Sequence, residues 1–127
     1  MEEDPRQREL TEKILAAIKK EYGFIPLINQ VLAERPDLFV PAANLGRAAV
    51  EGRGVMEKKT RYLCALAAAS AEGAEHCIRV QVEHAMREGA TKDEILEAMV
   101  IGSYMSMTKA QSYAFREYAK IFNLNTE

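Results

Sequence analysis

The chain has 127 residues, a formal net charge of −2 and a hydrophobic content of 48%, values typical of one folded domain spanning residues 1–127. A charge this close to zero offers no basic surface, so neither nucleic acid nor a membrane surface is expected as a partner. The longest weakly polar run, residues 63–71, is far shorter than the ~20 residues of a membrane span. Two cysteines and an acidic N-terminus indicate a cytoplasmic protein with reduced thiols.

Apolar residues recur at helical spacing, and glycines and prolines divide them into about six or seven helices. No segment alternates with period two, so the predicted fold class is all-α. In chain order the helices are expected over residues 5–22, 25–34, 36 to about 52, 56–72 and 75–88. A capping box at 91–94 opens the last helical segment, which extends to about Phe122, and polar residues 106–109 are expected to bend or divide it.

The fourth and fifth predicted helices are separated by two residues, Gly73 and Ala74. They should therefore form a central antiparallel helical hairpin. Cys77 falls in the first turn of the fifth predicted helix, beside His76. Gln81 and His84 follow Cys77 by four and seven residues, which places all three on one helix face.

Residues 56–104 resemble the carboxymuconolactone decarboxylase and alkylhydroperoxidase D-like family. The similarity is carried by Lys59-Thr60-Arg61, the alanine-rich run into Gly73, Cys77-Ile78, and the segments 85–91 and 93–98. Upstream, 22–26 and 34–38 are similar to the family's N-terminal helices. The resemblance implies a compact all-α domain that assembles into a homo-oligomer, a trimer or hexamer.

The alkylhydroperoxidase branch of the family implies a Cys-x-x-Cys-x-x-x-His motif, with a glutamate fifteen residues before the second cysteine. That branch reduces peroxides through its two thiols, while the glutamate and histidine relay protons. In this chain Cys77 matches the second cysteine, and His76 matches a histidine that often precedes it. The positions of the first cysteine, the histidine and the glutamate hold Ala74, Gln81 and Tyr62.

Cys77 has two interpretations. The first turn of a helix stabilises a thiolate through unsatisfied backbone N–H groups, although Glu72 and Glu75 oppose this effect. The alternative is a small buried residue with no chemistry. Cys64 lies roughly 9 Å further along the hairpin axis, too far for a disulfide with Cys77, and core packing is expected for it.

His84 could replace the missing base, but it lies ~10 Å along the helix from Cys77 and reaches the thiol only through Gln81, a water or a substrate. The His76 side chain diverges from Cys77 by about 100°. Tyr62 and Gln81 are expected to satisfy each other as a polar pair across the hairpin. The two histidines and nearby glutamates show no ligand spacing, so no metal and no cofactor is expected.

Three functions remain open. The first is a peroxiredoxin-like antioxidant oxidoreductase with one active cysteine, Cys77, assisted by His76 or His84 and supplied by an external thiol reductant. The second is a lyase acting on a small carboxylated lactone, with cations from Arg61, Arg79 and Arg87 and His84 as base. The third is a non-catalytic homo-oligomeric binding protein. The candidate site residues are Cys77, His76, His84, Tyr62 and Gln81.

Overall fold

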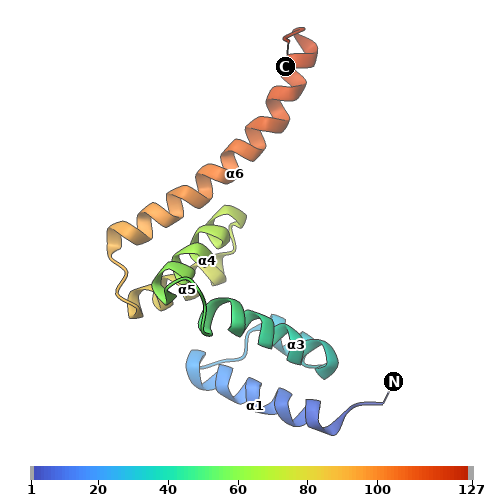
Figure 1. The fold of residues 1–127 in the computed structure, drawn as a ribbon. Coiled ribbons are helices and arrows are strands. Elements are labelled where there is room, and N and C mark those ends of the chain that lie inside the picture. The colour runs from blue at the N-terminus through green and yellow to red at the C-terminus, as the bar shows by residue number, and fades with distance from the viewer. Residues whose placement is uncertain (1, 126–127) are drawn as a thin grey trace. The chain divides into compact units, whose positions relative to one another are not determined.

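A computed structural model describes residues 2–125. All regular secondary structure in these residues is helical, and they contain no strand. The all-α prediction is confirmed. The elements are α1 (Pro5–Tyr22), α2 (Leu27–Leu32), α3 (Pro36–Gly46), η1 (Arg47–Glu51), α4 (Lys58–Glu72), α5 (Glu75–Arg87) and α6 (Lys92–Ile121), shown in Figure 1. No helix in the described part of the chain has the length and apolar character that crossing a membrane requires.

Contacts divide the chain into two compact units, Met1–Gly54 and Val55–Glu127. The single domain expected over 1–127 stays a prediction. In the first unit α3 packs against both α1 and α2. Phe39 and Val40 on α3 are buried, as is Thr11 on α1, whose hydroxyl donates to the Gln7 carbonyl oxygen at 2.8 Å. These residues are among the few buried ones that the structure describes in this unit.

The helix predicted from Pro36 to about Gly52 changes its winding before it ends. Its α-helical part stops at Gly46, and η1 continues as a π-helical turn. The Gly52 N–H donates to the Arg47 carbonyl oxygen at 2.7 Å, five residues back, which is the hydrogen bond of a π-helix. The chain is therefore helical where predicted, but the wider turn re-aims the side chains of Arg47 and Glu51.

The second unit begins with the predicted hairpin of α4 and α5. Gly73 ends α4 in the left-handed conformation, with φ of 68°, a backbone geometry that costs glycine little. The Ala74 N–H then donates to the Ala69 carbonyl oxygen at 3.0 Å, which completes the reversal of the chain. Two residues thus suffice to place α5 against α4.

Helix α6 is one continuous helix of 30 residues, so the predicted division at 106–109 is wrong. The hydroxyl of Thr108 donates to the Met105 carbonyl oxygen at 2.9 Å, within the same helix. A polar side chain satisfied in this way does not interrupt the backbone pattern. The predicted start is confirmed: Thr91 Oγ1 accepts from the Glu94 N–H, and Glu94 Oε1 accepts from the Thr91 N–H, at 3.1 and 3.0 Å.

The core of the second unit consists of Leu66, Ile95 and Ala98, where α4 meets α6. Next to it the two backbones come very close. A Cβ atom placed on Gly102 would lie 2.0 Å from the carbonyl oxygen of Ala67, so no other residue fits there without a shift of the main chain. The absence of a side chain at Gly102 sets the distance between α4 and α6.

Candidate functional site

The hairpin brings two of the predicted site residues into contact. Tyr62 on α4 and His84 on α5 are each 6% exposed, and their ring centroids lie 5.0 Å apart at an interplanar angle of 51°. With the reversal at Gly73 and Ala74, the position opposite Tyr62 falls close to His84. The contact between these two rings therefore follows from the short connection. His84 is therefore a buried histidine.

Two further polar side chains of the hairpin are half-buried and have buried atoms without a hydrogen-bond partner among the described residues. Gln81 lies one turn before His84, and its carbonyl oxygen Oε1 is buried and accepts no hydrogen bond from the described residues. Arg61 precedes Tyr62, and its Nε and Nη1 atoms are buried without an acceptor in the described chain. Gln81 Oε1 therefore accepts no hydrogen bond from Tyr62, whose ring packs against His84. An unmet buried donor or acceptor costs about 1–3 kcal/mol, so such atoms mark a place where a polar ligand or water belongs.

Cys77 and His76 lie on the surface of α5, apart from this buried group. Both residues are exposed. The face of α5 that packs on the core carries Ile78 and Val82, and Cys77 lies one residue, or about 100°, away from it. The helix face that Cys77 shares with Gln81 and His84 is thus exposed at Cys77, near the turn, and buried at His84. The interpretation of Cys77 as a buried residue is wrong.

The five predicted site residues differ in their exposure. Tyr62 and His84 are buried and Gln81 is half-buried, whereas His76 and Cys77 are open to solvent. Spacing along the helix indicates a shared face, but it does not say which part of that face the neighbouring helix covers. Near the reversal α4 contributes small residues, and near His84 it contributes Tyr62.

Cys64 is exposed, so the expectation that it packs in the core is wrong. The buried stripe of α4 runs through Tyr62, Leu66 and Ala69. Cys64 stands two residues from both Tyr62 and Leu66, which turns its side chain about 200° away from them. Both cysteines are free thiols.

An ion pair joins the start of α4 to the start of α6. Lys59 Nζ lies 3.1 Å from Glu94 Oε2. The backbone hydrogen bond from Thr91, together with this lysine, holds the pKa of Glu94 below its usual range. Lys59 and Glu94 thus connect the two helices that flank the core.

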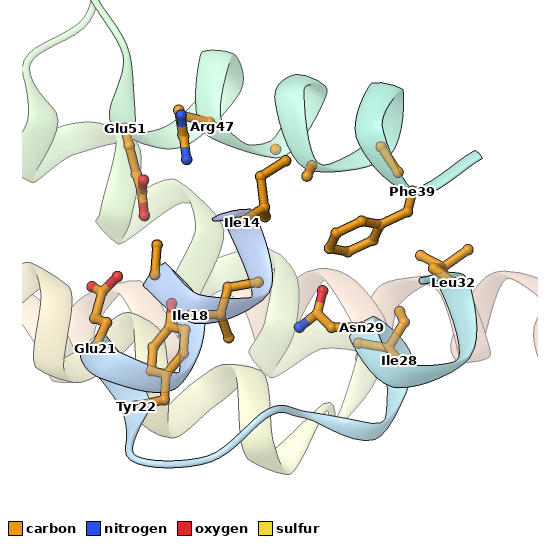
Figure 2. Close-up of a pocket in the computed structure, with 14 residues that line it drawn as sticks. Ile14, Ile18, Glu21, Tyr22, Ile28, Asn29, Leu32, Phe39, Arg47 and Glu51 are labelled. Atoms are coloured by element: carbon orange, nitrogen blue, oxygen red, sulfur yellow. The ribbon is translucent and has the colours of Figure 1, made fainter. Parts of the chain in front are cut away.

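No cluster of three or more His, Cys, Asp and Glu side chains suited to a metal ion occurs among residues 2–125. A cavity of about 380 Å³ does occur, but it lies in the first unit and is lined by residues between Ile14 and Glu51 (Figure 2). None of the five predicted site residues lines it. Sequence reasoning missed this cavity, because the alanines and isoleucines around it have the spacing of ordinary helix packing.

The comparisons with known proteins agree with the motif-based resemblance. Residues 36–120 match the model of the carboxymuconolactone decarboxylase family. One relative, named "Uncharacterized protein 4 in cox locus", of Paracoccus denitrificans, is 35% identical over 66 residues, covering 52% of this chain and 60% of the relative. The chain thus matches less than two thirds of that relative's length. No solved structure matches. The family match covers well over half of the sequence, and the chain therefore belongs to the carboxymuconolactone decarboxylase family.

Proposed function

We propose that the protein is a thiol-dependent peroxidase in which the Cys77 sulfur is the reacting atom. The observation that carries this proposal is the exposure of that thiol in the first turn of α5. Ala74, the residue before the helix, makes no side-chain cap, so no side chain competes for the backbone N–H groups of the first turn. Such N–H groups stabilise a thiolate, and exposure gives a peroxide direct access to it.

The reaction needs one protein thiol and two external ones. The Cys77 thiolate attacks one oxygen of a peroxide; the S–O bond forms, the O–O bond breaks, and the alkoxide leaves with a proton as an alcohol. A first external thiol attacks the resulting sulfenic acid, giving a mixed disulfide and water, and a second releases Cys77 and forms the external disulfide. The reductant is external because the position of a resolving cysteine holds Ala74. His76, exposed beside Cys77, is the proton donor in this scheme, and the buried His84 is not.

The two exposed cysteines allow a matched test. Peroxide consumption with dithiothreitol as reductant is measured for Cys77→Ser and for Cys64→Ser, and the sulfenic acid is trapped with dimedone and located by peptide mass spectrometry. Cys77→Ser should reduce turnover to the level of free reductant, and Cys64→Ser should leave it unchanged. Undiminished turnover in Cys77→Ser, or equal labelling of the two thiols, contradicts the proposal. Thiols inert until unfolding would favour a non-catalytic binding protein.

A second function, a lyase acting on a small carboxylated lactone, is favoured by one specific observation. The Nε and Nη1 atoms of Arg61 have no acceptor among the described residues, and a guanidinium group binds a carboxylate well. The buried His84 is a candidate base near the same end of the hairpin. Its test is a screen of acidic lactones for binding and turnover with the wild type and with Arg61→Gln. Turnover that falls in Arg61→Gln but persists in Cys77→Ser would favour the lyase over the peroxidase. No binding and no turnover would remove it.

We also propose that the protein is a homo-oligomer, a trimer or hexamer, in a reducing compartment such as the cytoplasm. The support is the outer surface of α6, where large apolar side chains are exposed along most of its length: Leu96, Val100, Ile101, Tyr104, Met105, Met107, Tyr113, Phe115, Tyr118 and Ile121. A surface of this kind is typical of an interface between subunits. Light scattering should give three or six times the 14.2 kDa of one chain, and a mass near one chain would contradict the proposal.

A further inference from the structure

The cavity in the first unit has the volume of a small-molecule site. It measures about 380 Å³, within the range of ligand pockets, roughly 300–1,000 Å³. All its lining residues come from α1, α2, α3 and η1, so one unit builds the whole lining. Most of the lining is apolar, and its larger apolar side chains are Ile14, Ile18, Ile28, Leu32 and Phe39.

Small residues leave this space unfilled. Where α1 and α3 face the cavity, they contribute Ala17, Ala42, Ala43 and Gly46. Apolar walls that face a void lack the van der Waals contacts of a closely packed interior. A bound molecule of matching size would supply those contacts, so the lining favours an occupant with an apolar body.

Charge gives this cavity no preference for an ion of either sign. Its polar lining residues are Glu21, Tyr22, Asn29, Arg47 and Glu51. Glu21 and Tyr22 each take part in an interaction of their own. The other two charged residues, Arg47 and Glu51, are opposite in sign and lie one turn apart on η1, so an ion attracted by one is repelled by the other. A charged ligand would lose its hydration without a net electrostatic gain, and a neutral ligand would not.

Asn29 supplies the hydrogen-bonding group for a neutral ligand. Figure 2 shows its side chain directed from α2 into the space on the Phe39 side of the cavity, away from Arg47 and Glu51. The residue is half-buried. Among residues 2–125 its backbone N–H donates to the Pro26 carbonyl oxygen, but its side-chain amide forms no hydrogen bond. A carboxamide both donates and accepts, so it can bind a hydroxyl or a carbonyl group.

We propose that this cavity binds a small neutral molecule that has an apolar body and one hydroxyl or carbonyl group. The apolar body lies among Ile18, Ile28 and Phe39, and the polar group lies at the side-chain amide of Asn29. None of the lining residues takes part in the proposed chemistry of Cys77, so this proposal does not depend on peroxidase activity.

A set of probes with one phenylbutyl body tests the site in the full-length protein: 4-phenyl-1-butanol, butylbenzene, 4-phenylbutylamine and 4-phenylbutyrate. Each is titrated at neutral pH, where the amine is a cation and the butyrate an anion, and ¹H–¹⁵N spectra record the amide shifts. We expect saturable shift changes concentrated in α1, α2 and α3, and weaker binding of both ions than of the alcohol. Tighter binding of either ion overturns the neutral preference. No saturable binding, or shift changes confined to α4, α5 and α6, overturns the site.

Two matched variants test the hydrogen bond. Asn29→Leu keeps the approximate size of the side chain and removes its amide. It should weaken binding of 4-phenyl-1-butanol about fivefold, the value of one hydrogen bond, without weakening that of butylbenzene. Asn44→Leu, exposed on α3 and outside the lining, is the control and should change neither. Equal binding of the alcohol to the wild type and to Asn29→Leu contradicts the role of Asn29.

Two further variants test the volume and the balance of charge. Ala43→Leu occupies part of the cavity and should weaken binding of every probe about tenfold. Full binding to this variant overturns the site; if it does not fold, weaker alcohol binding in Asn29→Leu but not in Asn44→Leu decides the same question. Glu51→Gln leaves the charge of Arg47 without its opposite, and it should tighten binding of 4-phenylbutyrate about threefold relative to the alcohol. An unchanged ratio contradicts the balance of these two charges.

Discussion

The two units of the chain solve helix packing in opposite ways. In Val55–Glu127, α4 and α6 approach so closely that Gly102 has no space for even a methyl group. In Met1–Gly54, α1 and α3 face each other across small residues that leave a cavity of about 380 Å³. Both units use alanine and glycine at helix contacts. In one unit small residues bring backbones together, and in the other they leave room between side chains.

This contrast indicates where each unit can carry function. In the unit with the family motif, α4 and α6 are closely packed, and the proposed reacting thiol, Cys77, lies on the surface. The N-terminal unit has none of the motif residues but has a cavity of about 380 Å³, a volume within the range of small-molecule pockets. An exposed thiol and a cavity are thus features of different parts of the sequence.

The greatest loss of stability should come from a methyl group added at the close contact. Gly102→Ala forces the Ala67 carbonyl to move, and overpacking of this kind costs about 3 kcal/mol. The matched change is Gly46→Ala in the other unit, where an added Cβ meets nothing within 4 Å. It should be neutral or stabilise by up to about 1 kcal/mol, because alanine has the higher helix propensity.

Urea unfolding combined with amide hydrogen exchange measures both changes in separate regions. Gly102→Ala should lower the free energy of opening for the amides of α4 and α6, and Gly46→Ala should not lower it for those of α1 and α3. Equal destabilisation by the two variants would contradict the contrast between a closed and an open helix contact.

A more modest loss is expected at the two helix starts that side chains cap. Thr91→Ala removes the acceptor for the Glu94 N–H, and Asp4→Ala removes the acceptor for the Arg6 N–H. Losing such a cap costs about 1 kcal/mol. The full cost is expected for Thr91, which lies between α5 and α6, two helices that both pack against α4. A smaller cost is expected for Asp4, because the residues near a chain end fray even when the cap is present. Thermal unfolding monitored by circular dichroism measures both losses of stability. A larger loss in Asp4→Ala than in Thr91→Ala would contradict this prediction.

The weakest of these effects concerns pH. The pKa of Glu94 is lowered in the folded protein by the Thr91 backbone hydrogen bond and by Lys59. Its contribution to stability is therefore present above the ordinary carboxyl pKa and is lost as the pH falls through the lowered value. Unfolding measured from neutral to acid pH should show a shallower loss of stability in Glu94→Gln than in the wild type. Glu97→Gln, exposed on the same helix, is the control, and an identical slope in all three proteins would exclude this role of Glu94.

Local signals made part of the structure predictable from the sequence. Gly73 and the Thr91–Glu94 capping box end and begin helices through chemistry that is complete within a few residues, and both were placed correctly. The family assignment rested on motifs of the same local kind and is confirmed. The continuity of α6 past residues 106–109 was missed, because polar side chains can satisfy themselves within a helix.

The candidate site was less predictable because it depends on burial. A helical wheel places Cys77, Gln81 and His84 on one face, but only the neighbouring helix determines that His84 is buried and Cys77 is not. The same reason explains the error at Cys64, for which the usual burial of free cysteine suggested a core position although the buried stripe lies on the other side of α4. The space near Phe39 depends on volumes on three helices and has no local signal at all.

The π-helical turn at Arg47–Glu51 has a consequence for how this protein tolerates changes in length. A π turn is equivalent to an α-helix with one residue inserted, so deletion of a single residue there restores the α-helical phase without breaking the helix. Every side chain after the deletion would then rotate by about 100° relative to those before it. A deletion of one residue at this point would therefore rotate the side chain of Glu51 relative to the cavity residues that precede it, while the chain keeps its helical content.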